Sequence, residues 1–400
     1  MTTLAYLEKG LSTLRWLPAY LRQRCFRPRS DAHPVHLLIA LADHFEPAIQ
    51  PGSPGTFADS KEQLRRLEKW CRKYPEAVES WPDDEGRPFR HTYFYPAEQS
   101  DPALIARLAE HCHEGWGEIE IQLHHGVHSP DNAENTRRAL LEFRDALAAC
   151  RCLSRLDGVG PAKYAFVHGN WALANSAHGR FCGVDDEMQI LANTGCYADF
   201  TLPSAPSSAQ VRKINSLYEC GAPLDKAVPH RRGNELRCGK APQIFPLMIQ
   251  GPLMLNLARR RRGWPSPGIE NGEITTANPP TIARLKLWQQ ASITVQGRPE
   301  WLFIKLHCHG MDPRDEQAML GSQIQQFLRE LVGQPDRLDK YRVHFVTARE
   351  MVNIALAACD GHSGNPSAYR DYRLKLNRSG ESKKSLVLNG QDRGLDSLPT

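Results

Sequence analysis

The sequence predicts an α/β fold built on parallel strands. Short apolar runs alternate with helix-like segments over about 320 residues, an order typical of parallel sheets. Three of the runs end in clusters of histidine or aspartate. Because the carboxyl ends of parallel strands meet at one edge, this pattern favours a barrel whose loops converge on one site.

Length and composition indicate one main domain. The chain has 400 residues, 41% hydrophobic and 24% charged, as expected of a soluble globular protein. We expect an amphipathic helix in 1–30, a barrel in 33–360 with an insertion at about 201–280, and a disordered tail in 374–400. The net charge of +5, without a nucleic-acid-binding motif, predicts no nucleic-acid partner. Eleven unpatterned cysteines and no secretory signal predict free thiols and a cytoplasmic location.

The first expected element is an amphipathic helix over residues 4–22. Leucines recur there at helical spacing, with Lys and Arg between them. Two interpretations stay open: the helix docks on the domain, or it rests as a basic helix on a membrane surface or a partner. No apolar run approaches the ~20 residues that span a bilayer, so any membrane contact is expected to be peripheral.

The first predicted strand, 35–42, is continuously apolar, as central parallel strands are. Caps, prolines and periodicity give the later elements. These are helix 59–74 ended by Pro75, an irregular aromatic stretch 75–100, helix 102–115 begun by Asp101-Pro102, strand 118–123, helix 132–150, strand 164–167, a short strand 189–191, helix 281–290, strand 301–306, helix 313–332, strand 343–346 and helix 348–358.

The strand at 118–123 introduces the densest group of candidate ligands. Isoleucine and leucine alternate with polar residues along it, which predicts a strand with one buried face. His124, His125 and His128 follow where the strand signal stops. Gly126 argues against a helix there, so these histidines are expected on a loop at the carboxyl edge of the sheet.

Histidine and aspartate at strand ends suit a hydrolytic zinc site. Such a site needs about three nitrogen or oxygen ligands and one open position for water, whose pKa the ion lowers towards neutrality. His124 and His128 are spaced to supply two ligands, and Asp43 or His44 after the first strand can complete the set. His307 or His309, after the strand at 301–306, can protonate a leaving group.

A purely structural interpretation exists for each cluster. Strand-end histidines often only form hydrogen bonds, and Asp43-His44 can cap a turn. Three separate strand ends nevertheless deliver ligand-type residues, and this coincidence favours a shared metal site.

The order Asp43-His44, His124-x-x-x-His128 and His307 resembles the motifs of the NodB-homology polysaccharide deacetylases. The resemblance implies a distorted (β/α)7-type barrel with a long irregular insertion. It also implies a divalent metal, Zn²⁺, held by His124 and His128 together with His44 or Asp43. In the family's scheme Asp43 is the general base, unless it is itself the ligand, with Glu46 as the alternative base, and His307 is the general acid.

That resemblance implies a metal-dependent hydrolase: a deacetylase of N-acetylated sugars in polysaccharide or glycoconjugate metabolism. Where the family has an arginine-proline-aromatic motif, this chain has Phe166-Val167-His168-Gly169-Asn170-Trp171. The residues expected to contact substrate are His125, which replaces the motif's hydroxyl residue, and His168, Asn170, Trp171, Tyr197 and His309.

The expected partner is a carbohydrate, and the basic segment 230–262 suits an anionic or lipid-linked one. Two alternatives stay open. A glycosidase of the same barrel superfamily would pair Asp43 or Glu46 with Asp199 or Asp312. A catalytically inactive barrel would only bind a glycan or a partner protein.

Overall fold

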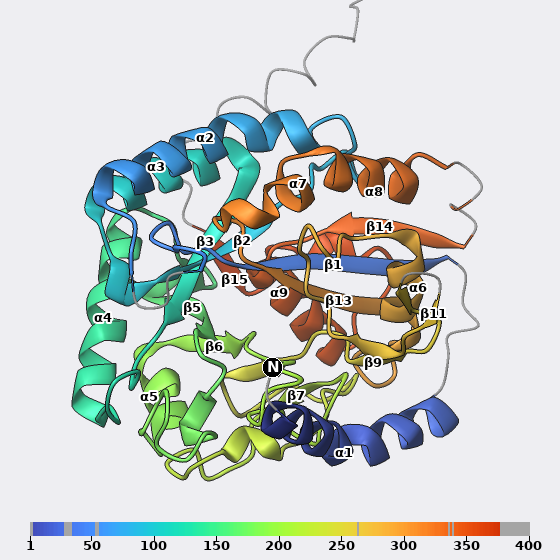
Figure 1. Cartoon of the computed structure of the whole chain (residues 1–400), viewed down its shortest axis with the longest axis horizontal. Coiled ribbons are helices and arrows are strands. Elements are labelled where there is room, and N and C mark those ends of the chain that lie inside the picture. Colours follow the sequence, from blue (N-terminus) through green and yellow to red (C-terminus); the bar gives the residue numbers. More distant parts are fainter. Residues whose placement is uncertain are drawn as a thin grey trace, which may run out of the picture.

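The computed structural model is a mixed α/β fold around a mostly parallel central sheet (Figure 1). It describes residues 3–27, 34–52, 56–261, 264–334, 337 and 340–376, with side chains from residue 15 onward except those of 260, 261 and 265. Nothing in the part of the chain so described forms a helix long and apolar enough to cross a membrane.

The central sheet follows the order β13-β1-β2-β3-β5-β6-β8-β7, and β14 also pairs with β1. Every neighbouring pair in this order is parallel except β7 with β8. The bounds are β1 (Val35–His44), β2 (His91–Pro96), β3 (Gly117–Leu123), β5 (Val159–His168), β6 (Cys196–Asp199), β7 (Leu217–Glu219), β8 (Leu247–Ile249), β13 (Trp301–Cys308) and β14 (Tyr341–Phe345). Within the described residues no strand pairing joins β7 or β8 to β13, so the sheet is not a closed barrel by hydrogen bonding.

Helices pack against both faces of this sheet. They are α1 (Thr3–Phe26), α2 (Ser60–Val78), α3 (Pro102–His111), α4 (Ala133–Ala149), α5 (Glu187–Thr194), α6 (Ile282–Gln290), α7 (Glu316–Met319), α8 (Ser322–Val332) and α9 (Ala348–Cys359). Figure 1 shows α2 and α3 along one edge of the molecule and α1 along the opposite edge, beside β7. Side chains cap several helix starts: Asp101, which the sequence predicts as a cap, and also Asn132, Thr281 and Thr347 each accept a backbone N–H there.

Several predicted elements differ from the structure. The helix at 59–74 continues through Pro75 to Val78, because the buried Ala77 and Val78 offset the hydrogen bond that proline removes. The stretch 75–100 contains β2, and 189–191 belongs to α5 rather than to a strand. The insertion at 201–280 supplies β8 to the main sheet, so it is not only a surface excursion.

Short strands also lie outside the main parallel order. Within the insertion, β9 (Met254–Asn256) pairs with β12 (Gly268–Glu270), and β10 (Arg260–Arg261) with β11 (Trp264–Pro265). The predicted disordered tail begins instead with β15 (Leu374–Leu376), which pairs with β4 (Ser154–Leu156). The rest of that prediction, 377–400, lies outside the described residues.

The described part of α1 is docked on the domain. Trp16 is fully buried, and Gln23 donates from its amide to the carbonyl of Ile214 at 2.7 Å. Arg27 donates to the carbonyl of Ala291, also at 2.7 Å. The docked interpretation is therefore confirmed for residues 15–27.

Residues along each strand alternate between two faces of the sheet. The outer face packs against α2, α3, α4 and α8, and in β1 it carries Leu37, Ile39 and Leu41. The inner face carries Leu38 and Ala40 among its β1 residues and packs against α1 and α9. The face to which a strand-end residue points therefore determines which neighbouring side chains it can contact.

The inner face of β3 is polar but buried, which the sequence did not predict. Glu118, Glu120 and Gln122 are no more than 3% exposed, although their alternation with apolar residues indicated a solvent-facing side. Glu118 pairs with Arg349 of α9 at 2.8 Å. Glu120 accepts hydrogen bonds from the Tyr197 hydroxyl and the backbone of Ala165. Both faces of β3 are thus buried, one by apolar packing and one by polar pairing.

The Glu118–Arg349 pair belongs to a larger buried ion network. Glu350 lies 2.6 Å from Arg90 and 3.0 Å from Arg370. Arg370 in turn contacts Asp83 at 3.1 Å. All of these side chains are less than 10% exposed, so each charge depends on its partners rather than on water.

Replacing one member tests this dependence. Arg349→Met would leave Glu118 buried without its cationic partner, and we expect the free energy of unfolding to fall by about 3–5 kcal/mol. Urea denaturation measures the change. The control is Arg373→Met, which breaks the half-exposed 3.2 Å pair with Asp157 and should change stability little. Equal effects of the two substitutions would contradict a stabilising role specific to the buried network.

The buried carboxyl group of Glu120 predicts how the stability of the protein changes with pH. Burial raises the pKa of Glu120 to about 8, although Tyr197 and the Ala165 N–H oppose the shift. A raised native pKa means that stabilisation is complete below the ordinary value of 4.5 and is lost as pH rises through about 8. Glu120→Gln, which mimics the protonated acid, should therefore flatten the stability profile between these pH values. Urea unfolding at a series of pH values checks this, and a profile identical to wild type would disprove it.

Candidate metal centres

Three clusters of potential metal ligands lie at or near the carboxyl ends of the parallel strands. In each cluster, one ligand atom per residue lies within 4.8 Å of the others. We name them the rim cluster, the loop cluster and the outer cluster. Their members, in that order, are His44, Glu46 and His309; His125, His168, Cys182 and Glu187; and Asp43, His91 and Cys308.

The pairing of β1 with β13 builds the rim cluster. The two strands are parallel, with Asp43 opposite Cys308. One residue further on, His44 and His309 come side by side with their ring centroids 4.9 Å apart. His44 is buried, whereas Glu46 and His309 are half-buried. The cluster therefore combines three donor groups with one side that opens towards solvent.

Two of the rim residues, His44 and Glu46, have shifted pKa values that suit binding of a cation. Burial lowers the pKa of His44 well below its ordinary value, and neighbouring His309 adds to the effect. Burial alone would raise the pKa of Glu46, but the hydrogen bond from His124 and the nearby imidazoles lower it to about 2. At neutral pH His44 is neutral and Glu46 is ionised, and these are the forms that bind metals.

An ion-paired histidine, His124, stands beside the rim cluster. Its Nδ1 lies 2.6 Å from Glu98 Oε1, and its Nε2 lies 3.4 Å from Glu46 Oε1. Burial opposes a charge on His124, but the two carboxylates outweigh it and raise its pKa to about 10. The ring packs so closely on Gly169 that a Cβ there would come within 2.2 Å of it. His124 is thus a cationic ring held in a fixed orientation by a carboxylate.

His307 lies on the inner face near the rim cluster, with its ring centroid 6.4 Å from that of His44. Burial, together with the charge of Lys305, lowers the pKa of His307 well below its ordinary value. Lys305 is itself fully buried, and burial lowers its pKa to about 7 against the opposing charge of Asp199. His307 is therefore a neutral imidazole at neutral pH, unlike His124.

Asp43 belongs to the outer cluster. The sequence predicts it as a base or ligand beside His44, but consecutive strand residues face opposite sides of the sheet. Asp43 accepts the Gly310 N–H at 2.6 Å and lies 2.8 Å from Nδ1 of His91. Gly310 approaches it so closely that an added Cβ would lie 2.2 Å from its Oδ2. Since Gly310 follows His309, Asp43 holds the backbone that presents His309 to the rim cluster.

The loop cluster is formed by the ends of β3 and β5 and by the loop that leads into α5. Glu187 Oε1 lies 2.9 Å from His125 Nε2 and 3.8 Å from His168 Nε2. Cys182 Sγ lies 3.6 Å from Glu187 Oε2. His125 and His168 are predicted as substrate contacts, but they are buried here among ligand-type groups. These four residues can hold a metal ion.

Charge pairing dominates the loop cluster when no ion is present. Burial lowers the pKa of His125, but the carboxylates of Glu187 and Asp131 outweigh burial and raise it to about 12. Asp131 accepts from the Nδ1 side of the ring, 3.0 Å away. His168 behaves oppositely, because burial lowers its pKa to about 3 despite Glu187. An ion bound here would take the place of the proton between His125 and Glu187.

The remaining predicted site residues lie elsewhere. His128 is exposed and is in none of the three clusters. Asn170 and Trp171 are half-buried in the loop after β5. Asp312 is paired with Arg314 at 2.5 Å. The predicted ligand pair of His124 and His128 is therefore not brought together as one of these groups.

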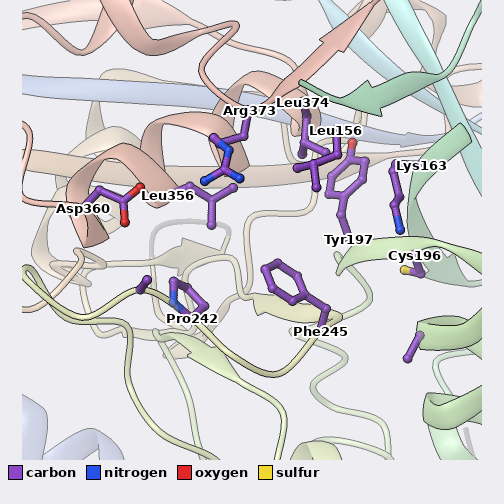
Figure 2. A pocket seen from close by; sticks show the side chains of 12 residues that line it. Leu156, Lys163, Cys196, Tyr197, Pro242, Phe245, Leu356, Asp360, Arg373 and Leu374 are labelled. Atoms are coloured by element: carbon purple, nitrogen blue, oxygen red, sulfur yellow. The ribbon is translucent and has the colours of Figure 1, made fainter. Parts of the chain in front are cut away.

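Tyr197 lies near the amino end of β6 and belongs to none of the three clusters. It lines a cavity of about 280 Å³ near the amino ends of β5 and β6. Figure 2 shows its ring with Leu156 and Leu374 on one side of this cavity, and Phe245 and Pro242 on the other. Tyr197, predicted as a substrate contact, lies away from all three clusters.

Among the residues of these sites, His91, Glu98, Cys182 and Glu187 were not predicted. Glu98 and His91 adjoin or lie in β2, and the strand itself was missed in an aromatic, proline-flanked stretch. A local signal does exist for the other two. Residues 182–187 read Cys-Gly-Val-Asp-Asp-Glu, which places a thiol and three carboxylates in one short segment.

Comparisons with known proteins add no identification. No protein-family model matches the chain, and no curated protein sequence matches it.

Asp43→Asn tests whether Asp43 positions His309. The carboxylate of Asp43 uses one oxygen for the Gly310 N–H and the other for His91. An asparagine has only one oxygen, so its amide N–H group would face one of these two partners. We therefore expect the free energy of unfolding to fall by about 1–3 kcal/mol. Urea denaturation of Asp43→Asn and of the exposed His128→Asn at one pH gives the comparison. Wild-type stability in the Asp43 variant would rule out the positioning role.

Proposed function

We propose that this chain is a metal-dependent hydrolase, and that it removes acetyl groups from N-acetylated sugars in polysaccharide or glycoconjugate metabolism. One observation supports the metal-dependent part: His44, Glu46 and His309 present donor atoms within 4.8 Å at a strand edge that opens to solvent. The carbohydrate part follows from the resemblance of the motifs at Asp43-His44, His124–His128 and His307 to those of NodB-homology deacetylases.

The rim cluster fits a catalytic divalent metal such as Zn²⁺. It offers two imidazoles and one carboxylate, the ligand types and number that catalytic zinc sites use. Nδ1 of His44 is buried and has no hydrogen-bond partner among the described residues. This ligand set keeps His44 from the predicted one but replaces His124, His128 and Asp43 with Glu46 and His309.

When bound, the ion would supply a water of lowered pKa and polarise the amide carbonyl. The protein's own residues would divide the proton transfers between two histidines of opposite character. His124, cationic and held by Glu98, would donate a proton to the departing amine. His307, neutral on the inner face, would accept the proton of the attacking water. This reverses the role that the family motif implies for His307.

The finer description of the fold is also a proposal: a distorted (β/α)7-type barrel that is completed by loops rather than by strand pairing. Two contacts support it. The backbone around Glu273 pairs with β13 at His307. Gly251, just beyond β8, packs so tightly that an added Cβ would lie 2.4 Å from the Lys305 carbonyl oxygen. The first contact joins the insertion to β13, and the second brings the end of β8 next to β13.

Three variants test the proposed function. His309→Ala should reduce both bound metal and acetate release from N-acetylglucosamine oligomers, because it removes a rim ligand. His124→Gln should keep the metal and lower kcat by about 10²–10⁴-fold, the size of a lost proton transfer. The exposed His128→Ala should change neither. Elemental analysis gives metal content, and an enzymatic acetate assay gives turnover.

Two results would replace the proposal with an alternative. New reducing ends without acetate would indicate a glycosidase. Bound metal without either product would favour a barrel that only binds glycan. Metal content and activity lost in His128→Ala but retained in His309→Ala would refute the rim cluster as the catalytic site.

A further inference from the structure

We propose that the loop cluster is a second metal site, distinct from the rim cluster and structural rather than catalytic. Its ion, of the Zn²⁺ type, would bind His125, His168, Cys182 and Glu187 and fix the loop between β5 and α5. The inference does not depend on the rim cluster holding an ion, because the two clusters share no residue.

The four donor atoms lie within 4.8 Å of one another, close enough for small movements to place them around one tetrahedral ion. With metal–ligand bonds of about 2.0–2.3 Å, neighbouring donors lie roughly 3.3–3.8 Å apart. His168 Nε2 lies 3.8 Å from Glu187 Oε1, and Cys182 Sγ lies 3.6 Å from the other oxygen, Oε2, so the carboxylate stands between the imidazole and the thiol. Only His125 Nε2, at 2.9 Å, is closer, as a hydrogen bond requires. A small outward movement of His125 would admit the ion.

The surroundings of Cys182 suit a metal-bound thiolate. Its sulfur accepts backbone N–H groups from Asn175 at 3.3 Å and from Val184 at 3.4 Å. Burial and the neighbouring Glu187 carboxylate raise the pKa of the Cys182 thiol, so these two N–H groups would stabilise a thiolate only once an ion has displaced the thiol proton. Nε2 of His168 is the second indication, because it is fully buried and has no hydrogen-bond partner among the described residues.

Hydrogen bonds from neighbouring groups also hold two of the four ligands, His125 and Glu187, in position. Asp131 lies 3.0 Å from Nδ1 of His125, so it can fix the ring with Nε2 directed inward. The second oxygen of Glu187 accepts the N–H of Ala174 at 2.6 Å. The site is closed, since none of its four residues is more than 7% exposed. Four protein ligands without an open position are typical of structural zinc, whereas the half-open rim cluster is typical of catalytic zinc.

The loop that this ion would hold is strained. Between β5 and α5, five residues other than glycine have positive φ: Trp171, Ala174, Asn175, His178 and Phe181. Such conformations persist only where the surroundings enforce them. The loop also packs against the rim region, because Gly169 at its start touches His124. An ion joining the strand ends to Cys182 and Glu187 would supply the constraint and keep His124 in place.

A hydrogen-bonded cluster without metal is the competing explanation. In it, His125 would remain a cation between Asp131 and Glu187. His168 would keep its proton on Nε2, since the Asn170 N–H approaches Nδ1 at 3.3 Å. Only metal binding makes the thiol of Cys182 a ligand, so sulfur coordination separates the two explanations.

Cobalt substitution of the full-length protein is the decisive experiment. With Co²⁺ as the probe, we expect a thiolate-to-cobalt charge-transfer band in the near ultraviolet. The band should persist in His309→Ala and disappear in Cys182→Ser. Cys220→Ala, which removes another buried thiol outside the three clusters, should leave it unchanged. Absence of the band from the wild-type protein, or its survival in Cys182→Ser, would overturn the proposal.

A second measurement does not require a loop variant to fold. His309→Ala, which keeps the loop cluster intact, is treated with a chelator and then with trypsin. Arg180 is exposed in the loop, and we expect cleavage after it to accelerate at least several-fold once the ion is removed. An unchanged cleavage rate would count against a structural ion. Failure of the catalytic proposal alone would leave the cobalt band and this protection intact.

Discussion

The pairing of charges inside the sheet is the constraint on which the rest of the structure depends. β3 presents glutamates to the inner face, where water does not reach them, and a buried carboxylate is costly unless it is paired. Glu118 is paired with Arg349 of α9. Glu350, also in α9, is paired with Arg90 and Arg370. The network ties β3 and α9 to the segment around Arg370, so the position of β3, and with it that of His124 and His125, depends on these ion pairs.

Strand geometry then divides the functional residues between two faces. Adjacent residues at a strand end point to opposite sides, so Asp43 and His44 belong to different clusters. His44 turns inward to the rim cluster, and Asp43 turns outward to hold Gly310. The same alternation continues past the end of β3. His124 reaches Glu46 and Glu98 on the inner side, while His125 reaches Glu187 in the loop cluster.

The rim and loop clusters differ in the property that separates catalytic from structural metal sites. Three donors with one open side leave room for water and substrate, whereas four buried donors leave none. Their proximity is also informative, because Gly169 connects the loop to His124 by direct contact. A loop fixed at Cys182 and Glu187 would hold the imidazole that we assign to proton donation. One strand end would then provide both the reactive histidine and the ligand that stabilises its surroundings.

The sequence by itself determined the parallel α/β class, most element positions, the helix caps and the strand ends that carry histidines. These follow from local periodicity and capping, which act over a few residues. It did not determine that β3 is buried on both sides, because the alternation of isoleucine with glutamate looks the same whether the polar face meets water or Arg349. Nor did it determine the ligand sets. Glu98, Cys182 and Glu187 approach the histidines only through folding of distant segments, so tertiary structure alone decided which residues share a site.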